Sequence, residues 1–352
     1  MDKGEESIFD REKARATVSR GGRSRWIERK GSTAKRFQYV TFDGKKLGGN
    51  EVERIKALVV PPAWTNVRIN PSTKGRIQAI GIDVKGRVQY LYEASFAKRQ
   101  QIAKFSKITR FGEQIPKLIN RTNADINSAG HSKEKVLAVV MRLINSLYFR
   151  MGSDLSVKHY KTFGITTIQK RHLRIHTKGK LEFEFVGKSH IPHRKIFVDA
   201  ELATIIKQIA AIKGGRKLFR YIDESGKAKA VTPADVNRYI KDATNAEFTA
   251  KDLRTWGGTL LTAIGLAEAG FSTNEAEKKK RIVRVIKSVA EELGNTPTVC
   301  RSSYIHPAVL SAYDQGVTIE QFRRRAERRV KKLKLDSIVE EEALVSLLKR
   351  YE

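Results

Sequence analysis

Chemistry in this chain has to come from arginine, lysine, histidine, asparagine and tyrosine side chains. The single cysteine, Cys300, excludes an internal disulfide and a cysteine metal cluster. The acidic residues form no nuclease-like metal motif, and no GxxxxGK(S/T) loop for nucleotide phosphates is present. Arginine offers fixed donors that match phosphate oxygens, lysine can give up a proton, and a tyrosine hydroxyl can attack phosphorus. These residue types favour metal-free cleavage of a phosphodiester, with cations on the non-bridging oxygens and an acid for the leaving oxygen.

The net charge points to a polyanionic partner. Lys and Arg number 69 against 38 acidic residues, giving +31, and the sequence pI is about 10.2. A field of that size attracts nucleic acid and makes binding fast and salt-dependent. The charge is spread over the whole chain, which favours a protein that surrounds a duplex over one with an appended basic arm. An anionic membrane surface or a ribosomal setting would also attract such a protein, and charge alone does not separate an enzyme from a passive DNA binder.

The sequence gives no sign of a membrane or secreted protein. No apolar run approaches the ~18 residues that span a bilayer. Residues 1–23 are charged and lack the apolar core of a signal peptide. We therefore expect a soluble protein that is not secreted. With nucleic acid as its partner, the expected location is the cytoplasm, in association with the nucleoid.

The length of 352 residues predicts two or three domains, because single cores seldom grow past roughly 250 residues. Residues 1–34 are polar and basic, and we expect a partly disordered arm there. Residues 35–100 contain short apolar segments separated by turn signals, which predicts a β-rich domain that contacts DNA. The clearest hairpin joins residues 77–82 to residues 88–92 around Asp83-Val84-Lys85-Gly86.

Residues 101–352 predict a larger, mainly helical domain with a small antiparallel sheet and a basic C-terminal tail, so the expected fold class is α+β. Apolar residues recur at helical spacing between Val136 and Leu147, after a cap at Ser132. Alternation between residues 173 and 198 predicts strands, with turns at 177–179 and 186–189. The sequence also predicts helix starts at Thr232, Thr249 and Pro307 and a helix end at Gly294.

Short boxes of the C-terminal half carry a specific resemblance. Residues 149–152 read FRMG and precede GITT at 164–167 and KRH at 170–172. Residues 185–188 read FVGK, residues 251–257 read KDLRTWG, and residues 294–307 read GNTPTVCRSSYIHP. In this order and spacing they resemble the first arginine box, the lysine hairpin, the KDLR box and the tyrosine segment of bacterial and poxvirus-type type IB DNA topoisomerases. The N-terminal half is similar to the same family at PPAW (61–64), QA (78–79), GRVQY (86–90), AKF (103–105) and FG (111–112), so the resemblance runs from about Trp26 to Tyr313.

The resemblance implies an enzyme that relaxes supercoiled DNA by nicking one strand, letting the duplex turn and resealing the nick. Tyr304 would attack phosphorus and become a 3′-phosphotyrosyl ester, which conserves the bond energy so that resealing needs no ATP. Arg150 and Arg254 would contact the scissile phosphate. Lys188 would be the general acid for the 5′-oxygen, and Asn295 would donate a hydrogen bond to a non-bridging oxygen. The implied catalytic domain is similar to that of tyrosine recombinases, and no metal or cofactor is expected.

The local sequence predicts how these residues are presented. Gly187 is expected to free the turn that exposes Lys188 at a hairpin tip. Arg254 falls in the first turn or so of a helix, and we expect it to face outward while Leu253, Trp256 and Leu260 pack inward. The expected partner is double-stranded DNA, clamped by a monomer. The candidate DNA contacts are Gln78, Tyr90, Lys170, Arg171, His172 and Lys251.

Some positions depart from the family pattern. Asn295 stands where poxvirus and nuclear members have histidine, and Glu93 stands where many bacterial members have histidine. Residues 153–162 differ from the viral loop that helps to choose the cleavage sequence, so the sequence preference of this chain is open. Asn295 could also simply end a helix beside Gly294, and Lys188 could be a solvated turn lysine.

Tyrosine recombinases are the alternative function, because they share the Arg, Lys, Arg and Tyr chemistry. They usually carry a histidine three residues before the second arginine, where this chain has Lys251. They also have a helical N-terminal domain in place of a β-rich one. A DNA binder without catalysis is a further alternative, and the full set of polar residues at the family positions argues against it.

Overall fold

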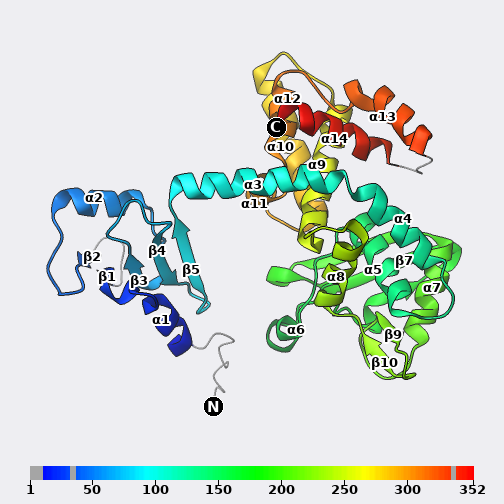
Figure 1. Cartoon of the computed structure of the whole chain (residues 1–352), viewed down its shortest axis with the longest axis horizontal. Coiled ribbons are helices and arrows are strands. Elements are labelled where there is room, and N and C mark those ends of the chain that lie inside the picture. Colours follow the sequence, from blue (N-terminus) through cyan, green and yellow to red (C-terminus); the bar gives the residue numbers. More distant parts are fainter. Residues whose placement is uncertain (1–10, 32–36, 334–337) are drawn as a thin grey trace. The chain divides into compact units, whose positions relative to one another are not determined.

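A computed structural model describes residues 11–31, 37–333 and 338–352 of the chain (Figure 1). The chain divides into two compact units, residues 1–104 and residues 105–352. The division falls inside helix α3 (Ala94–Gly112), whereas the sequence placed the domain boundary near residue 100. Helices dominate the larger unit and antiparallel sheets occur in both, so the fold class is α+β.

The smaller unit is organised around a five-stranded antiparallel sheet with the strand order β2-β1-β3-β4-β5. The predicted hairpin is confirmed, because β4 pairs with β5 and Gly86, at a φ of +78°, allows the tight turn between them. β4 is buried on both faces: Ala79 packs with Ile55 on one side, and Ile80 packs with Val18 on the other. The elements are α1 (Arg11–Ser19), η1 (Arg23–Arg25), β1 (Ile27–Lys30), β2 (Gln38–Val40), α2 (Gly49–Ala57), β3 (Thr65–Ile69), β4 (Ile77–Ile82) and β5 (Val88–Tyr92).

The N-terminal segment differs from the partly disordered arm that the sequence predicted over residues 1–34. α1 and β1 are both folded, and Ala14 and Val18 of α1 are buried beside Ile82 of β4. α1 is strongly polar, and the few apolar residues that it buries gain a partner only once the sheet has formed. Periodicity alone therefore could not reveal it. Residues 1–10 and 32–34 of the predicted arm lie outside the described residues.

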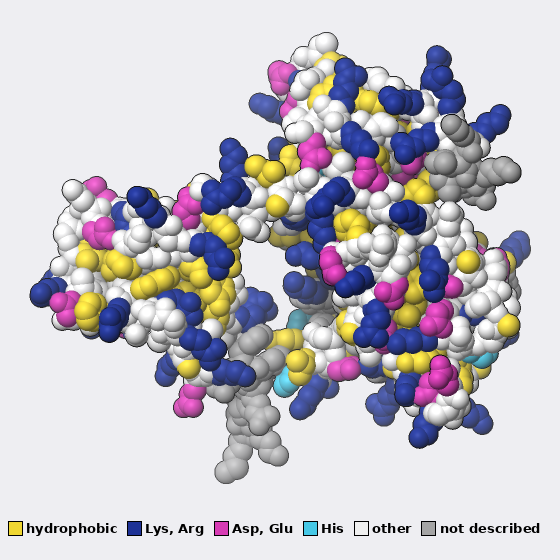
Figure 2. All heavy atoms as spheres, in the orientation of Figure 1, with side chains coloured by type: hydrophobic (Ala, Val, Ile, Leu, Met, Phe, Trp, Pro, Cys, Tyr) yellow, Lys and Arg dark blue, Asp and Glu magenta, His cyan; other side chains and the backbone are white. Residues whose placement is uncertain are grey.

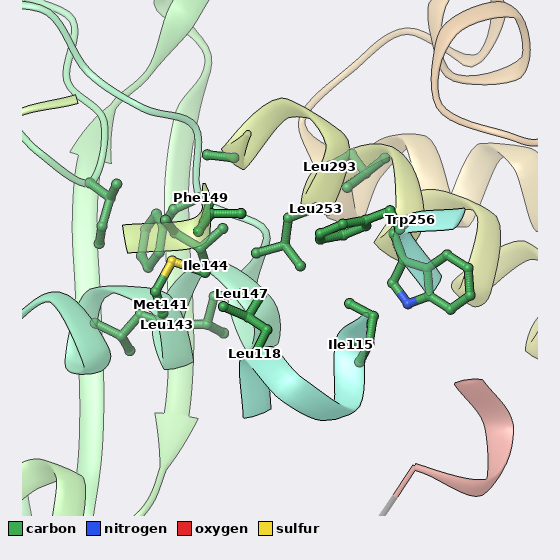
Figure 3. Packing of buried hydrophobic residues seen from close by; sticks show 14 of the residues in the cluster. Ile115, Leu118, Met141, Leu143, Ile144, Leu147, Phe149, Leu253, Trp256 and Leu293 are labelled. Carbon is green, nitrogen blue, oxygen red and sulfur yellow. The ribbon is translucent and has the colours of Figure 1, made fainter. Parts of the chain in front are cut away.

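The larger unit has a continuous apolar core that runs through its helices. α5 (Lys133–Leu147) begins at the predicted cap, where the Ser132 hydroxyl accepts a hydrogen bond from Lys135 N at 3.2 Å. Figure 3 shows Leu253 and Trp256 of α9 (Ala250–Ala269) among core side chains such as Leu147 of α5. This packing holds the first turns of α9, which carry Arg254, against α5, whose end precedes Arg150.

The predicted small sheet is confirmed and has the strand order β6-β7-β8. β7 (Lys180–Val186) and β8 (Pro192–Val198) pair in register from Lys180 opposite Val198 to Val186 opposite Pro192. β6 (Leu173–Ile175) lies on the other side of β7 and joins it through the predicted turn. The β7–β8 hairpin thus carries Lys188 at its tip.

The predicted helix starts and the predicted helix end are also confirmed. Thr232 and Thr249 form capping boxes with Asp235 and Asp252. α10 (Glu275–Leu293) is ended by its C-terminal cap Gly294, which has a φ of +61°. No helix in the described residues is long and apolar enough to cross a membrane. The remaining elements are α4 (Ile115–Ile126), α6 (Asp154–Tyr160), η3 (Lys170–His172), η4 (Thr177–Gly179), η5 (Lys188–His190), α7 (Ala200–Ala211), β9 (Arg220–Ile222), β10 (Ala228–Ala230), α8 (Pro233–Thr244), α10 (Glu275–Leu293), α11 (Pro297–Ser303), α12 (Pro307–Asp314), α13 (Glu320–Leu333) and α14 (Val339–Tyr351).

Candidate active site

Cations from separate parts of the sequence line one small pocket in the larger unit. Arg150 follows α5, Lys188 lies at the tip of the β7–β8 hairpin, and Arg254 lies in the second turn of α9. The fold therefore brings together the predicted arginines and the predicted lysine. The pocket is completed by Leu147, Tyr148, Phe149, Phe163, Phe185, Gly187, His193, Lys195, Glu292 and Leu293.

Both arginines are anchored to the carboxyl end of α10. Arg150 Nη2 donates to Gly294 O at 2.7 Å, and Arg254 Nη2 donates to Leu293 O at 2.8 Å. The last carbonyls of a helix carry partial negative charge and lack partners within the helix. The end of α10 therefore fixes the two guanidinium groups side by side and offsets part of their repulsion.

Arg254 is 5% exposed, so the expectation that it faces outward was wrong. The prediction rested on the rule that charged side chains face water, whereas this guanidinium points into the pocket and has the Leu293 carbonyl as a partner. Burial lowers the pKa of Arg254, the Arg150 charge lowers it further, and Tyr304 acts in the opposite direction. Burial also lowers the pKa of Arg150. Both cations are thus poorly solvated, and an anion such as a phosphodiester would relieve their repulsion.

Tyr304 follows α11 and lies against the second arginine. The guanidinium carbon of Arg254 is 5.6 Å from the centre of the Tyr304 ring. α9 also places the tyrosine backbone, because Thr259 Oγ1 donates to Tyr304 O at 3.2 Å. A Cβ at Gly258 would lie 2.7 Å from Tyr304 O, so only glycine allows this approach. The tyrosine and Arg254 are therefore positioned by the same helix.

Asn295 closes the end of α10, which was one of the two alternatives for this residue, and its side chain lies beside Arg150. Its backbone N–H donates to Ala290 O at 2.8 Å, which closes the end of α10. Its side-chain oxygen accepts a hydrogen bond from Arg150 Nη2. Its Nδ2 is buried and has no hydrogen-bond partner within the described part of the chain. A structural role is therefore present, and an amide donor next to Arg150 is still available.

Lys188 is exposed at the hairpin tip, as expected, but Gly187 does not act as predicted. Gly187 has a φ of −95°, which other residues adopt freely, and the positive φ values of this turn belong to Ser189 and His190. What requires glycine is space, because a Cβ at this position would lie 2.5 Å from His193 Cδ2. The glycine thus brings the Lys188 turn close to the His193 ring.

His193, Lys195 and Glu292 line the pocket and were missed in the sequence. His193 and Lys195 project from β8 on the half-buried side of its alternating pattern, and Lys195 Nζ donates to Glu292 O at 2.7 Å. Burial, together with the charges of Arg150, Lys195 and Arg254, lowers the pKa of His193 to about 4, while Glu292 opposes the shift. The alternation of β8 could have indicated that His193 and Lys195 lie on the same side as the inward Phe197. It could not show that this side faces the pocket.

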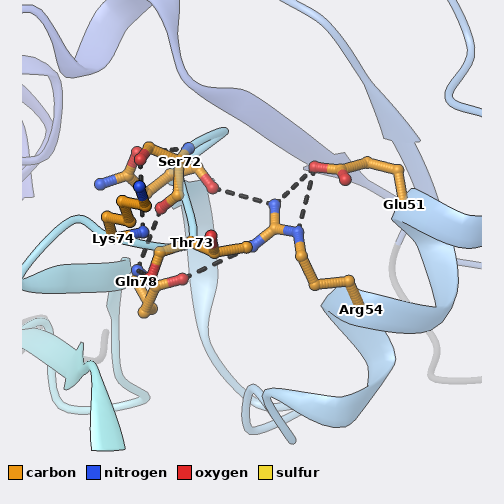
Figure 4. Close-up of polar contacts among 7 residues, drawn as sticks. Glu51, Arg54, Ser72, Thr73, Lys74 and Gln78 are labelled. Carbon is orange, nitrogen blue, oxygen red and sulfur yellow. Dashed lines mark hydrogen bonds and ion pairs between the residues drawn. The ribbon is translucent and has the colours of Figure 1, made fainter. Parts of the chain in front are cut away.

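Gln78 is buried, so the structure does not offer it as a direct DNA contact. Its Nε2 donates to the carbonyls of Ser72, Thr73 and Gly75, and its Oε1 accepts from Arg54 (Figure 4). The side chain instead organises the loop before β4. Sequence position alone could not separate this role from a contact with bases.

Of the other candidate DNA contacts, some form hydrogen bonds within the protein and the rest are exposed. Lys170 Nζ donates to Ile212 O at 2.7 Å, and His172 Nδ1 accepts from Gln169 N at 3.0 Å, so both hold the chain before β6. Tyr90, Arg171 and Lys251 are exposed. Figure 2 shows Lys and Arg side chains spread over the visible faces of both units, in keeping with the uniform basic composition.

Comparison with known proteins agrees with these features. Residues 93–333 match a family model described as eukaryotic DNA topoisomerase I, catalytic core, and residues 36–83 match one described as bacterial DNA topoisomerase IB, N-terminal domain. The DNA topoisomerase 1B of Acanthamoeba polyphaga mimivirus is 33% identical over 295 residues, which cover 80% of this chain and 85% of the relative. The DNA topoisomerase 1 of rabbit fibroma virus is 27% identical over 270 residues (73% and 80%). The DNA topoisomerase 1B of vaccinia virus (strain Copenhagen) is 24% identical over 269 residues (73% and 80%).

Proposed function

The chain belongs to the type IB DNA topoisomerases, and from that identity we propose that it relaxes supercoiled DNA through a covalent tyrosyl intermediate. Tyr304 Oη attacks the scissile phosphorus and forms a P–O bond to the 3′ side of the break, and its proton passes to solvent. The P–O5′ bond breaks, and Lys188 protonates the departing 5′-oxygen. The duplex turns about the intact strand, after which the 5′-hydroxyl attacks the tyrosyl ester and reverses the step.

The observation that carries this proposal is the pairing of Arg150 and Arg254 at the end of α10, with Tyr304 against Arg254. Two fixed guanidinium groups can bind both non-bridging oxygens of a phosphodiester as negative charge grows on them. Since the end of α10 already holds the guanidinium groups, little rearrangement is needed when DNA binds. Lys188 lines the same pocket, and this position supports its proposed role as the acid.

Asn295 supplies a further hydrogen bond in this proposal. Its unpartnered Nδ2 donates to a non-bridging oxygen, while its Oδ1 stays on Arg150. A neutral amide can perform this task without changing its protonation state. The chemistry needs neither a metal ion nor ATP, because the charge is balanced by side chains and the ester keeps the bond energy.

The substrate in this proposal is double-stranded DNA, clamped by a monomer that works on the nucleoid in the cytoplasm. Exposed Tyr90, Arg171 and Lys251 contact the duplex, mostly at phosphates, so binding is largely indifferent to sequence. The catalytic unit resembles that of tyrosine recombinases in its residue set. Lys251, three residues before Arg254, and the β-rich smaller unit favour relaxation over recombination.

The direct test is relaxation of a supercoiled plasmid in EDTA without ATP. We expect both positive and negative supercoils to relax, and the Tyr304→Phe variant to bind the plasmid without relaxing it. An absolute requirement for magnesium or ATP would refute the proposal. A requirement for paired sites and a tetramer would support the recombinase alternative.

A further inference from the structure

His193 fills the space between the two segments that carry Lys188 and Asn295. On one side, a Cβ at Gly187 would lie 2.5 Å from His193 Cδ2 and 2.6 Å from Nε2. On the other side, a Cβ at Gly294 would overlap with His193 Cε1. The two glycines, which immediately precede Lys188 and Asn295, thus both approach the Nε2 end of the ring. The imidazole is in contact with the hairpin tip and with the end of α10 at the same time.

The ring is held in this place by its own sheet and by its neighbour on the strand. His193 lies opposite Phe185 in the β7–β8 pairing, and the two rings stack with centroids 5.2 Å apart and an angle of 26° between them. Two residues later, Lys195 donates to Glu292 O at 2.7 Å. The same face of β8 therefore contacts the end of α10 through the His193 ring and through the hydrogen bond from Lys195 to Glu292 O.

The charges around His193 favour the uncharged form of its imidazole ring. Arg150, Lys195 and Arg254 face the ring as cations, and Glu292 is the acidic residue nearby, so a second charge on the imidazole would be repelled. No described residue forms a hydrogen bond with the ring nitrogens. His193 therefore acts through the shape and the stacking of its ring, and not through a hydrogen bond from a ring nitrogen.

We propose that His193 is a positioning residue that docks the Lys188 hairpin against the end of α10, so that the acid and the phosphate-binding groups keep their spacing. The inference rests on the proposed function, in which Lys188 protonates the 5′-oxygen. Without the ring, the hairpin tip loses its contact with Gly294, and Lys188 moves relative to Arg150 and Asn295. Proton delivery should then suffer more than stabilisation of the phosphate charge.

The test compares two substrates in single-turnover cleavage at a mapped site. One is an ordinary duplex, and the other has a 5′-bridging phosphorothiolate, whose sulfur leaves without a proton. We expect His193→Ala to slow cleavage of the ordinary duplex by about 10- to 100-fold, the range that a misplaced catalytic group produces. On the phosphorothiolate substrate the same variant should cleave at close to the wild-type rate.

Conservative variants show which property of the ring matters. His193→Phe keeps the stacking and the volume and should restore most of the rate on the ordinary duplex. His193→Gln keeps a hydrogen-bond donor but loses the ring and should remain slow. Ile196→Ala, on the exposed side of β8, is the matched control and should not change the ratio of the two rates.

A second variant, Gly187→Ala, tests the same contact and keeps the proposal testable if His193→Ala does not fold. Gly187→Ala adds a methyl group against the ring at a backbone φ of −95° that alanine tolerates, so its effect reports the contact and not backbone strain. It should show the same selective defect on the ordinary duplex. In the double variant the two defects should be less than multiplicative, because both act through one contact.

Several results would overturn the proposal. Equal slowing of His193→Ala on both substrates would place its effect on the arginines instead of on Lys188. An active His193→Gln together with an inactive His193→Phe would assign the role to a ring nitrogen. Unchanged cleavage rates in both His193→Ala and Gly187→Ala would show that the contact of the His193 ring has no part in catalysis. Failure of the wild-type protein to form a covalent adduct would instead contradict the proposed function itself, so the two failures are distinguishable.

Discussion

Arg150 and Arg254 donate hydrogen bonds to the adjacent carbonyls of Gly294 and Leu293, so two like charges share one helix end. This arrangement uses the planar, multiply donating guanidinium, which can hold a carbonyl with one nitrogen and a phosphate oxygen with another. A lysine has all three of its N–H donors on one nitrogen, so it could bind both partners only if both lay within hydrogen-bond reach of that single atom. In the proposed mechanism, the backbone at the carboxyl end of α10 therefore helps to hold the groups that bind the phosphate.

Arg254→Lys should therefore be a severe change although it keeps the charge. We expect single-turnover cleavage to slow by about 10² to 10³-fold, the usual cost of one lost donor to a developing oxyanion. Binding of uncleaved DNA, measured by titration, should change much less. A variant that cleaves at the wild-type rate would show that a point charge is sufficient here.

Lys188→Ala tests the assignment of the acid. Loss of a general acid should slow cleavage of an ordinary duplex by about 10² to 10⁴-fold. Cleavage of the 5′-bridging phosphorothiolate should be largely restored, because its leaving group needs no proton. If the variant stays equally slow on that substrate, Lys188 acts electrostatically and not as an acid.

Asn295→Ala separates the structural role of this residue from its proposed catalytic role. Loss of the Nδ2 donor should slow cleavage and religation together by about 10² to 10³-fold and leave their ratio nearly unchanged, since both steps share a transition state. Asn295→His should keep substantial activity because it also offers an N–H. Asn295→Asp should be worse than Ala, because its charge opposes the phosphate and binds Arg150.

The opposite result for Asn295→Ala would be a loss of stability without a loss of catalysis. If the residue only closes α10, the alanine variant would lose about 1 kcal/mol of stability at most and keep its chemistry. A wild-type single-turnover rate in a folded Asn295→Ala protein would remove the residue from the catalytic set.

The pH dependence of stability should report on His193. Its pKa is lowered to about 4 in the folded protein, below the usual value near 6.5 of an unfolded histidine. Because the unfolded ring binds its proton first, this contribution to stability is complete above about pH 6.5 and is lost as the pH falls toward about 4. Urea unfolding should therefore show that the wild-type protein loses more stability between about pH 7 and pH 5 than His193→Phe does. Equal losses in the two proteins would show that the ring titrates normally in the fold.

The sequence predicted most of what local patterns encode. The caps at Ser132, Thr232 and Thr249, and the helix end at Gly294, follow from backbone donors and acceptors that neighbouring residues must satisfy. The β4–β5 hairpin and the β7–β8 hairpin follow from alternation and turn residues.

What could not be predicted depends on contacts that form only in the folded chain. The burial of Arg254 requires the end of α10, and the need for glycine at position 187 requires the ring of His193. The docking of α1 needs the finished sheet, and the buried amide of Gln78 needs the loop that it holds. Leu293 is 39 residues from Arg254, and the contacts of Gln78 and Gly187 depend on how a loop and a hairpin fold, so periodicity gives no signal for them.

The most direct test of the account is the identity of the covalent link. A duplex cleaved by the wild-type protein and trapped with denaturant should leave a peptide containing Tyr304 on the 3′-phosphate end of the nicked strand. Tyr304→Phe should form no adduct while still binding DNA, whereas Tyr160→Phe and Tyr313→Phe should form it. Tyr313 is 1% exposed and its hydroxyl donates to Gly270 O at 2.7 Å, so it is not available as a nucleophile. An adduct on another tyrosine, or one linked to the 5′ end, would contradict the account.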